Sequence, residues 1–418
     1  MAKPRSLVWV LAGVNLFIMM GLGLVSPVLP LYAESFGVSY AAVGFLISVF
    51  PMLRLVTNLP GGVLGNRLGE RQVGAAGAAL VAFGAWVSGS APTFRWLIAG
   101  QALQGLGSSL FVTNAMSFIM RVTPAERMGK TMSIYQGSFS LGVSVGPIVG
   151  GFLASLGGFR LPFFVYGVLA AVSCVLTWVY IQAPAAERGA PKRPGLWAQG
   201  REVRRLFSRY EFVLSLLLTA MIFWIRAGLR HTTLPLYARD VAGVDTFRIG
   251  LLLSVITVTN LLVLWPAGRA VDRSRKAVAV GSSLAVAFSA VALGWADSFS
   301  GLILASLFFG VTTGFCGVPP TVIASDVMPS SARGGGLGVF RMAGDIGFIT
   351  GPILSGFAIT HIGYAWTFWV FAAGALIVFG LTLKMKETLR PGTPRPQEAG
   401  PLAREGAETG RGDPPRGV

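Results

Sequence analysis

Five charged residues interrupt long apolar runs and are the residues most able to do chemistry in this chain: Arg54, Arg226, Arg230, Arg341 and Asp345. A charged side chain inside an apolar segment is costly, so it faces a partner, a cavity or water. Such groups pair, attract opposite charges or, for a carboxylate, carry a proton. The chain has no CxxC or HExxH pattern and no other usual catalytic constellation. We therefore expect binding and ion pairing rather than an enzyme, with no metal and no cofactor.

Asp345 and Arg54 lie deep within two separate apolar runs. Each stands about 11 residues from the end of its run, a depth of roughly 16 Å at the rise of an α-helix. Arg341 lies one turn from Asp345 and shares its helix face. Asp345 is the only carboxylate at such depth, so it is the residue that we expect to carry a coupling proton.

The composition indicates a polytopic membrane protein. Of the 418 residues, 53% are hydrophobic and only 12% are charged, which is outside the range of soluble proteins. Twelve apolar spans, each about 20 to 26 residues long, can cross a hydrocarbon core of about 30 Å. The expected all-α spans are 7–32, 40–65, 72–92, 96–120, 130–156, 161–182, 211–238, 246–268, 277–296, 300–325, 335–360 and 364–384.

The chain divides into two six-span halves. We expect an N-terminal half over 1–182, a linker over 183–210, a C-terminal half over 211–385 and a disordered tail over 386–418. The linker mixes Pro, Gly and Arg, with a short amphipathic helix predicted around Leu196 to Phe207.

The distribution of Lys and Arg predicts the orientation. If the N-terminus is cytoplasmic, 26 of the 34 basic residues lie on the inner side, four lie in apolar spans, and Arg95, Arg160, Arg239 and Arg248 lie outside. Positive loops stay in the cytoplasm. We therefore expect a multi-pass protein of the inner membrane with both termini cytoplasmic. The net charge of +17 reflects this topology, so no nucleic-acid partner is expected.

The two halves are internal repeats. Leu29–Ala33 and Leu234–Ala238 have the same five residues, LPLYA, at an offset of 205. Gly44 matches Gly250 at an offset of 206, as does the stretch that begins at Gly62 with the one that begins at Gly268. Six spans per copy predict parallel halves related by an axis along the membrane normal.

A glycine pattern also occurs twice. The first copy contains Gly142, Gly146, Pro147, Gly150 and Gly151, and the second contains Gly347, Gly351, Pro352 and Gly356. Glycines at four-residue spacing let a neighbouring backbone approach closely, and the proline bends the helix. We expect a helix-packing hinge that serves as the seam between the halves.

These motifs resemble those of the major facilitator superfamily, and the resemblance covers residues 7 to 384. The loop from Gly62 to Arg71 is similar to the family's G-x-L-A-D-R-x-G-R-K signature, with Asn66 in place of the acid and Glu70 in place of a base. Gln101 to Gly107 resembles the R-x-x-Q-G-x-G motif, with Gln101 in place of Arg. The stretch from Gly146 to Gly151 resembles the G-P-x-x-G-G motif of drug–proton antiporters, so the pattern is closest to efflux-type members.

The signature loops predict a cytoplasmic gate. Its candidate residues in the two copies are Gly62, Asn66, Arg67, Gly69, Arg71, Gly268, Asp272 and Arg273. Arginines there can bind carboxylates or the carboxyl ends of helices in one conformation and release them in the other. The alternative is that they only anchor the topology.

The resemblance implies that the second and eleventh helices pack together, which pairs Arg54 with Asp345. Either this pair is a static salt bridge or Asp345 couples transport to protons. The resemblance also implies a central cavity lined by the first, fourth, seventh and tenth helices. There Arg226 and Arg230 are expected to attract an anion, while Gln101, Gln104 and Asn15 add hydrogen bonds. Alternatively, Arg230 extends to the outer interface.

The expected function is secondary active transport of a small organic solute by alternating access, as efflux by proton antiport. A metabolite importer or uniporter of the same fold remains open, as does a membrane sensor that does not transport. The lipid bilayer, an anionic small-molecule substrate and protons are the expected partners, and a monomer is expected.

Overall fold

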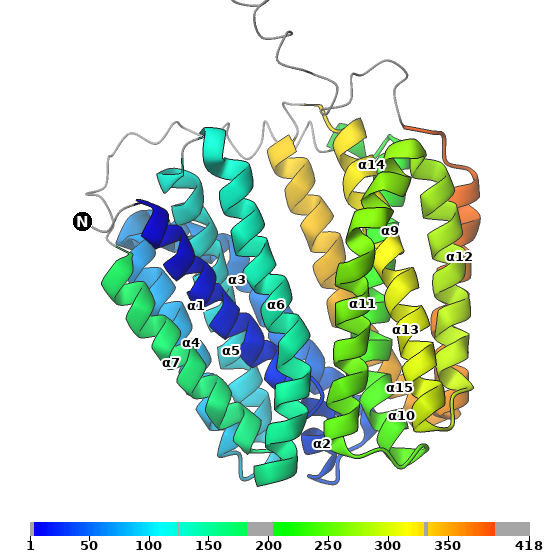
Figure 1. Ribbon diagram of the computed structural model, residues 1–418, viewed down its shortest axis with the longest axis horizontal. Helices are drawn as coiled ribbons and strands as arrows, with labels where there is room; N and C mark the ends of the chain where they lie inside the picture. The colour runs from blue at the N-terminus through cyan, green and yellow to red at the C-terminus, as the bar shows by residue number, and fades with distance from the viewer. Residues whose placement is uncertain (1–3, 124, 182–203, 330–332, 389–418) are drawn as a thin grey trace, which may run out of the picture.

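The computed structural model describes residues 4–123, 125–181, 204–329 and 333–388, and these parts of the chain are helical with no strand (Figure 1). The N-terminal half contains α1 (Pro4–Val25), α2 (Leu29–Glu34), α3 (Tyr40–Leu68), α4 (Glu70–Gly89), α5 (Phe94–Val122), α6 (Ala125–Gly157) and α7 (Leu161–Tyr180). The C-terminal half contains α9 (Tyr210–Ile225), the π-helix η1 (Arg226–Thr233), α10 (Leu234–Asp240), α11 (Thr246–Arg273), α12 (Arg275–Gly294), α13 (Phe299–Cys316), α14 (Pro319–Val327) and α15 (Arg333–Leu383).

Each expected span corresponds to one helix or to an interrupted helix. The first span breaks between α1 and α2, beside Pro27, and the tenth breaks before Pro319, because proline cannot donate the intrahelical hydrogen bond. The last two spans form α15, which is broken at Gly363, where φ is 78°. In the described part of the chain, nine segments are long and apolar enough to cross a membrane, and the longest is Gly336–Leu383 with this break. The protein is a multi-pass membrane protein.

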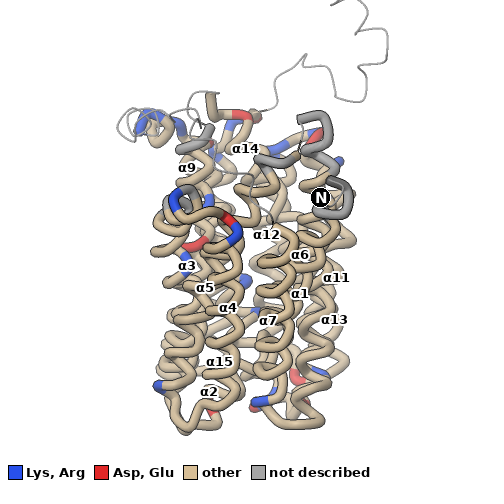
Figure 2. Tube along the Cα trace, turned by 90° about the vertical axis from the view of Figure 1, so that its left-hand side faces the viewer, with Lys and Arg blue, Asp and Glu red and all other residues tan. Residues whose placement is uncertain are grey.

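The two halves stand side by side along the bundle (Figure 1). We call the end where α1 and α9 begin the linker end, and the end that holds α2 and α10 the far end. Charged residues gather toward these two ends, and uncharged chain covers most of the length between them (Figure 2). The main hydrophobic core draws on both halves, with Leu31 and Leu46 from one and Leu234 and Leu253 from the other.

Two seams join the halves, α3 against α15 and α6 against α11. An added Cβ at Gly44 would lie 2.0 Å from the carbonyl oxygen of Pro352, and one at Gly250 would lie 2.3 Å from that of Pro147. These contacts are copies of each other, because Gly44 and Gly250 are matched positions, as are Pro147 and Pro352. The repeat found in the sequence therefore produces two equivalent seams.

The glycine stripe corrects one expectation. Added Cβ atoms at Gly142, Gly146 and Gly150 would collide with α1, which belongs to the same half. Those at Gly347 and Gly351 would collide with α9 and η1, again in the same half. Only the residues that flank each stripe, Pro147 with Gly151 and Pro352 with Gly356, lie between the halves. The stripe thus packs helices within a half, and the seam uses the adjacent helix face.

The predicted linker helix falls mostly outside the described residues, as does the tail from 389 to 418. Of the linker helix, Arg204 to Leu206 are helical, and Leu206 is 2% exposed. Its side chain packs with Phe212, Met328 and Phe340 of the C-terminal half.

Candidate functional site

An ion pair joins the halves near the middle of the bundle. Arg54 Nη2 on α3 lies 2.7 Å from Asp345 Oδ1 on α15, and the two side chains are 33% and 13% exposed. Toward the far end, Ser48 Oγ donates to the carbonyl oxygen of Ile349 at 2.6 Å. A charge-assisted bond at this depth satisfies two costly charges at once. Arg341, one turn from Asp345, is exposed and makes no ion pair among the described residues.

A π-helix interrupts the seventh span where its charges lie. Thr232 and Thr233 donate their hydroxyls to the carbonyl oxygens of Ala227 and Gly228, each five residues earlier and at 3.1 Å. Gly228 lacks a side chain, which lets Phe371 and the backbone of Gly351 approach. The two hydroxyls thus donate hydrogen bonds to carbonyl oxygens of the widened π-helical turn. π-Helical turns are frequent at functional sites.

Arg226 binds two neighbouring helices. Its Nη2 donates to Asn260 Oδ1 on α11 and to the carbonyl oxygen of Thr313 on α13, each at 2.7 Å. Asn260 in turn donates to the carbonyl oxygens of Ile256 and Gly310 at 3.0 and 2.8 Å. Asn260 therefore ties α11 to α13 and fixes the guanidinium of Arg226.

Arg230 also binds α11 and does not extend to the outer interface. It is 8% exposed, its Nη2 donates to Thr257 Oγ1, and its buried Nε has no hydrogen-bond partner. The next residue, His231, crosses to the other half, where its Nδ1 lies 2.9 Å from Ser26 Oγ. Ser26 and His231 occupy matched positions of the repeat, 205 residues apart.

The amides that were expected to line the cavity bind helices of their own half. Asn15 Nδ2 donates to the carbonyl oxygen of Tyr135 and to Ser138 Oγ on α6, both at 3.1 Å. Gln104 Nε2 donates to the carbonyl oxygen of Gly84 and to Ser88 Oγ on α4. Gln101 is 3% exposed and its Nε2 has no partner. Of these three amides, Gln101 keeps an unused donor.

The described gate residues make no contact between the halves. Gly69, with φ of 97°, forms the turn between α3 and α4. The guanidinium of Arg71 stacks over the ring of Trp178 at 4.4 Å, and Asp272 lies 3.9 Å from Arg275, in each case within one half. Arg67 and Arg273 are exposed. No neighbouring atom lies within 4 Å of a Cβ added at Gly268. The surroundings of Gly62 and the side chain of Asn66 lie outside the described part.

A charged cluster that sequence reasoning missed joins the halves at the far end. Arg239 on α10 forms an ion pair with Glu34 on α2, and also lies 2.7 Å from Asp240. Tyr40 on α3 donates to Asp240 Oδ2 at 2.9 Å, and Tyr364 on α15 donates to the same oxygen. Glu34 and Arg239 are matched positions 205 residues apart. The signal in the sequence was that Glu34 and Arg239 carry opposite charges and occupy matched positions of the repeat.

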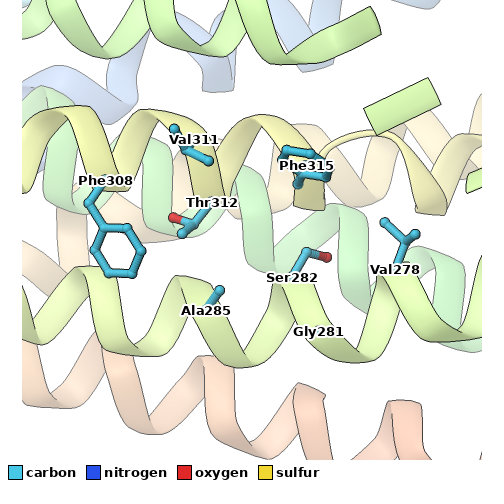
Figure 3. Close-up of a pocket in the computed structure, with 8 residues that line it drawn as sticks. All are labelled: Val278, Gly281, Ser282, Ala285, Phe308, Val311, Thr312 and Phe315. Carbon is cyan, nitrogen blue, oxygen red and sulfur yellow. The ribbon is translucent and has the colours of Figure 1, made fainter. Parts of the chain in front are cut away.

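A groove of about 340 Å³ lies between α12 and α13 (Figure 3). Val278, Ala285, Phe308 and Val311 point into it, and its polar groups are the hydroxyls of Ser282 and Thr312. A lining without charge offers a solute few orienting contacts. The groove is therefore not the candidate site.

Two repeated helical halves, two equivalent seams and charged pairs that cross between them define a two-halved membrane transport protein. A sequence profile of the Major Facilitator Superfamily matches residues 11–265 and 232–413. The chain belongs to the Major Facilitator Superfamily, and it is a transporter rather than an enzyme.

The relatives span several kinds of transporter. The uncharacterized MFS-type transporter MJ1560 of Methanocaldococcus jannaschii is 22% identical over 91% of this chain and 98% of its own. Quinolone resistance protein NorA of Staphylococcus aureus is 26% identical over 171 residues, 41% of this chain and 44% of its own. The crystal structure of nucleoside transporter NupG matches with a TM-score of 0.74 and 16% identity, over 91% of this chain and all of that one.

Proposed function

We propose that the protein is a secondary active transporter that exports a small organic solute in exchange for protons, by alternating access. The observation that carries this proposal is where the halves meet. Hydrogen bonds and ion pairs between the halves run from Glu34–Arg239 at the far end to Arg54–Asp345 at the middle. Among the described residues, none lies nearer the linker end. Two halves whose described contacts hold them together from the far end to the middle can rock about that end, as alternating access requires.

The orientation of this arrangement follows from the positive-inside rule. The linker end holds the beginning of α1, the loop with Arg67 and Arg71, and Arg273 at the end of α11. We therefore place this end and both termini in the cytoplasm, in an inner membrane. The far end is then the closed outer side. The described gate residues make no contact between the halves in this conformation, and we propose that they engage the other half when the linker end closes.

We assign proton coupling to Asp345, because it is the carboxylate that lies deep in the bundle. Its partner Arg54 belongs to the other half. Rocking of the halves changes the distance between Asp345 and Arg54, so this ion pair links the carboxylate to the conformational change. The likeness to NorA over 171 residues and the Gly146–Gly151 motif support export. Import or uniport is the second candidate, favoured by the structural match to a nucleoside transporter.

We assign solute binding to the middle of the bundle, with Arg226 and Arg230 as its cationic residues and Gln101 as a further donor, and we expect an anionic solute. Asn15 and Gln104 form hydrogen bonds to neighbouring helices of their own half, so we assign them to the wall around the binding site rather than to solute contact. The protein is proposed to work as a monomer, because each half already buries its seam against the other.

The test is proton movement in proteoliposomes with an internal pH dye. A pH gradient is imposed, and quinolones, nucleosides and aromatic carboxylates are added in turn. The wild-type protein should dissipate the gradient with at least one solute. Asp345→Asn should abolish that response while solute exchange continues, whereas Asp297→Asn, at an exposed position, should behave as wild type. A gradient response that survives in Asp345→Asn removes Asp345 as the coupling residue. Solute flux without any proton movement supports the importer or uniporter, and binding without flux supports a sensor.

A further inference from the structure

Among the residues that the structure describes, no acidic side chain forms an ion pair with the arginines of the seventh span. Neither Arg226 nor Arg230 belongs to an ion pair among the described residues. Arg226 and Arg230 contact α11 and α13, and between Arg248 and Ala270 of α11 and throughout α13 there is no Asp or Glu. Neither α1 nor α5 contains an acidic residue. Two guanidinium groups at this depth are costly unless an anion joins them.

The two guanidinium groups reach the same face of α11. Arg226 binds Asn260 and Arg230 binds Thr257, and residues three apart on a helix are neighbours, with Cβ atoms about 5–6 Å apart. The two arginines therefore converge on one region rather than pointing to separate sites.

Donors remain available in that region. The recorded hydrogen bonds of both arginines use Nη2, although a guanidinium has five N–H donors. Arg226 is half-buried and no hydrogen bond is found for its Nε or Nη1, while the Nε of Arg230 is buried without a partner. Free guanidinium edges match the two oxygens of a carboxylate or phosphate.

We infer that Arg226 and Arg230 form one anion-binding pocket in the C-terminal half, which takes the carboxylate, phosphonate or phosphate group of an organic solute. Asn260 and Thr257 are its positioning residues, because they hold the guanidinium groups through single side-chain bonds. This inference rests on the proposed transport function for its use, but the pocket itself is tested by binding alone.

The test uses purified full-length protein in detergent at constant ionic strength. The probes are four compounds of similar shape: benzoate, phenylphosphonate, neutral benzamide and cationic benzylammonium. Benzoate and phenylphosphonate should raise the thermal unfolding midpoint by about 2–4 °C near saturation, whereas benzamide and benzylammonium should not. Equal effects of benzoate and benzamide would overturn the inference.

Variants separate the pocket from general charge effects. Arg226→Gln and Arg230→Gln should each remove the response to benzoate, while Arg248→Gln, the same change at an exposed position, should keep it. Asn260→Ser should weaken the apparent affinity for benzoate and retain the preference over benzamide. An unchanged benzoate response in both Arg226→Gln and Arg230→Gln contradicts the pocket.

A further variant supplies the missing charge. Thr257→Asp places a carboxylate beside Arg230, so the midpoint without ligand should rise and the benzoate response should disappear. If Arg226→Gln and Arg230→Gln do not fold, Thr257→Asp and the wild-type preference for benzoate decide the question. A Thr257→Asp protein that still responds fully to benzoate overturns the inference.

Flux distinguishes this inference from the transport proposal. If benzoate binding depends on Arg226 but proteoliposomes show no solute flux, the pocket inference stands and the transport proposal is overturned. Proton-coupled flux of a neutral solute, with no benzoate binding, retains transport and overturns the pocket.

Discussion

At the scale of residues, the charges inside the bundle follow two different rules. Arg54 and Asp345 are separated by 291 residues along the chain and still satisfy each other across the halves. Among the described residues, Arg226 and Arg230 bind neutral groups: Asn260, Thr257 and backbone carbonyl oxygens. A paired charge can be static or can respond to protonation, whereas an unpaired cation requires a ligand. The first pair therefore suits coupling and the second suits recognition.

The pairing of Arg54 with Asp345 can be measured by a double-mutant cycle. Arg54→Gln should lower stability by about 1–2 kcal/mol, because it leaves a partly buried carboxylate without its partner, and the exposure of Arg54 reduces the loss. Adding Asp345→Asn to Arg54→Gln should recover part of it. Chemical unfolding of the four proteins in detergent gives the coupling energy. A value near zero would mean that the two side chains do not stabilise each other.

Gly69 tests the turn between α3 and α4. Its φ of 97° and ψ of 139° lie in a region that is essentially reserved for glycine. Gly69→Ala should therefore destabilise the protein by about 1–3 kcal/mol, seen as a lower thermal midpoint. Gly137→Ala is the control, because Gly137 lies in a helix with open space around an added Cβ. Equal midpoints for these two variants would show that the turn tolerates a side chain.

At the scale of elements, each seam is a close contact between one helix glycine and one proline carbonyl. Gly44 on α3 meets Pro352 on α15, and Gly250 on α11 meets Pro147 on α6. These contacts lie toward the far end, while nearer the linker end α3 packs on α5 through Gly61 and Gly65. α3 thus packs on both α15 and α5, and toward the linker end its glycine contacts are with α5, inside its own half.

Gly250→Ala should prevent close approach of α6 and α11, since an added Cβ would lie 2.3 Å from the carbonyl oxygen of Pro147. We expect the far end to open, with greater labelling of a cysteine introduced there and slower transport. Gly268→Ala in the same helix has free space and should leave labelling unchanged. Closed-state labelling in Gly250→Ala would show that the seam adapts without opening.

At the scale of the whole molecule, matched positions of the repeat meet each other. Ser26 contacts His231 and Glu34 pairs with Arg239, and both pairs are 205 residues apart. Residues related by a two-fold axis meet only where the axis passes between them. The far-end latch, defined as Glu34, Arg239, Asp240, Tyr40 and Tyr364, therefore lies close to the axis relating the halves.

This symmetry makes a charge exchange informative. Arg239→Glu alone puts three carboxylates together and should open the far end and slow transport. The double exchange Glu34→Arg with Arg239→Glu restores opposite charges at matched positions, so it should recover part of the closure. Distances between spin labels across the far end check both. If the double variant opens as far as the single one, the ion pair is not what closes this end.

Hydrophobic length, charge placement and internal repetition are local properties, so the sequence by itself determined the helical membrane fold, the two halves and their family. It also pointed to Arg54 with Asp345, because the two lie at the same depth along their helices and the family resemblance implies that these helices pack together. Tertiary structure alone decided which face of each helix meets which neighbour. It placed Gly142, Gly146 and Gly150 inside a half, turned Asn15 and Gln104 into helix contacts, widened the turn at Arg226–Thr233, and brought Glu34 to Arg239. Residue spacing defines which residues share one face of a helix, but not which neighbouring helix that face contacts. The packing of all helices together decides that contact.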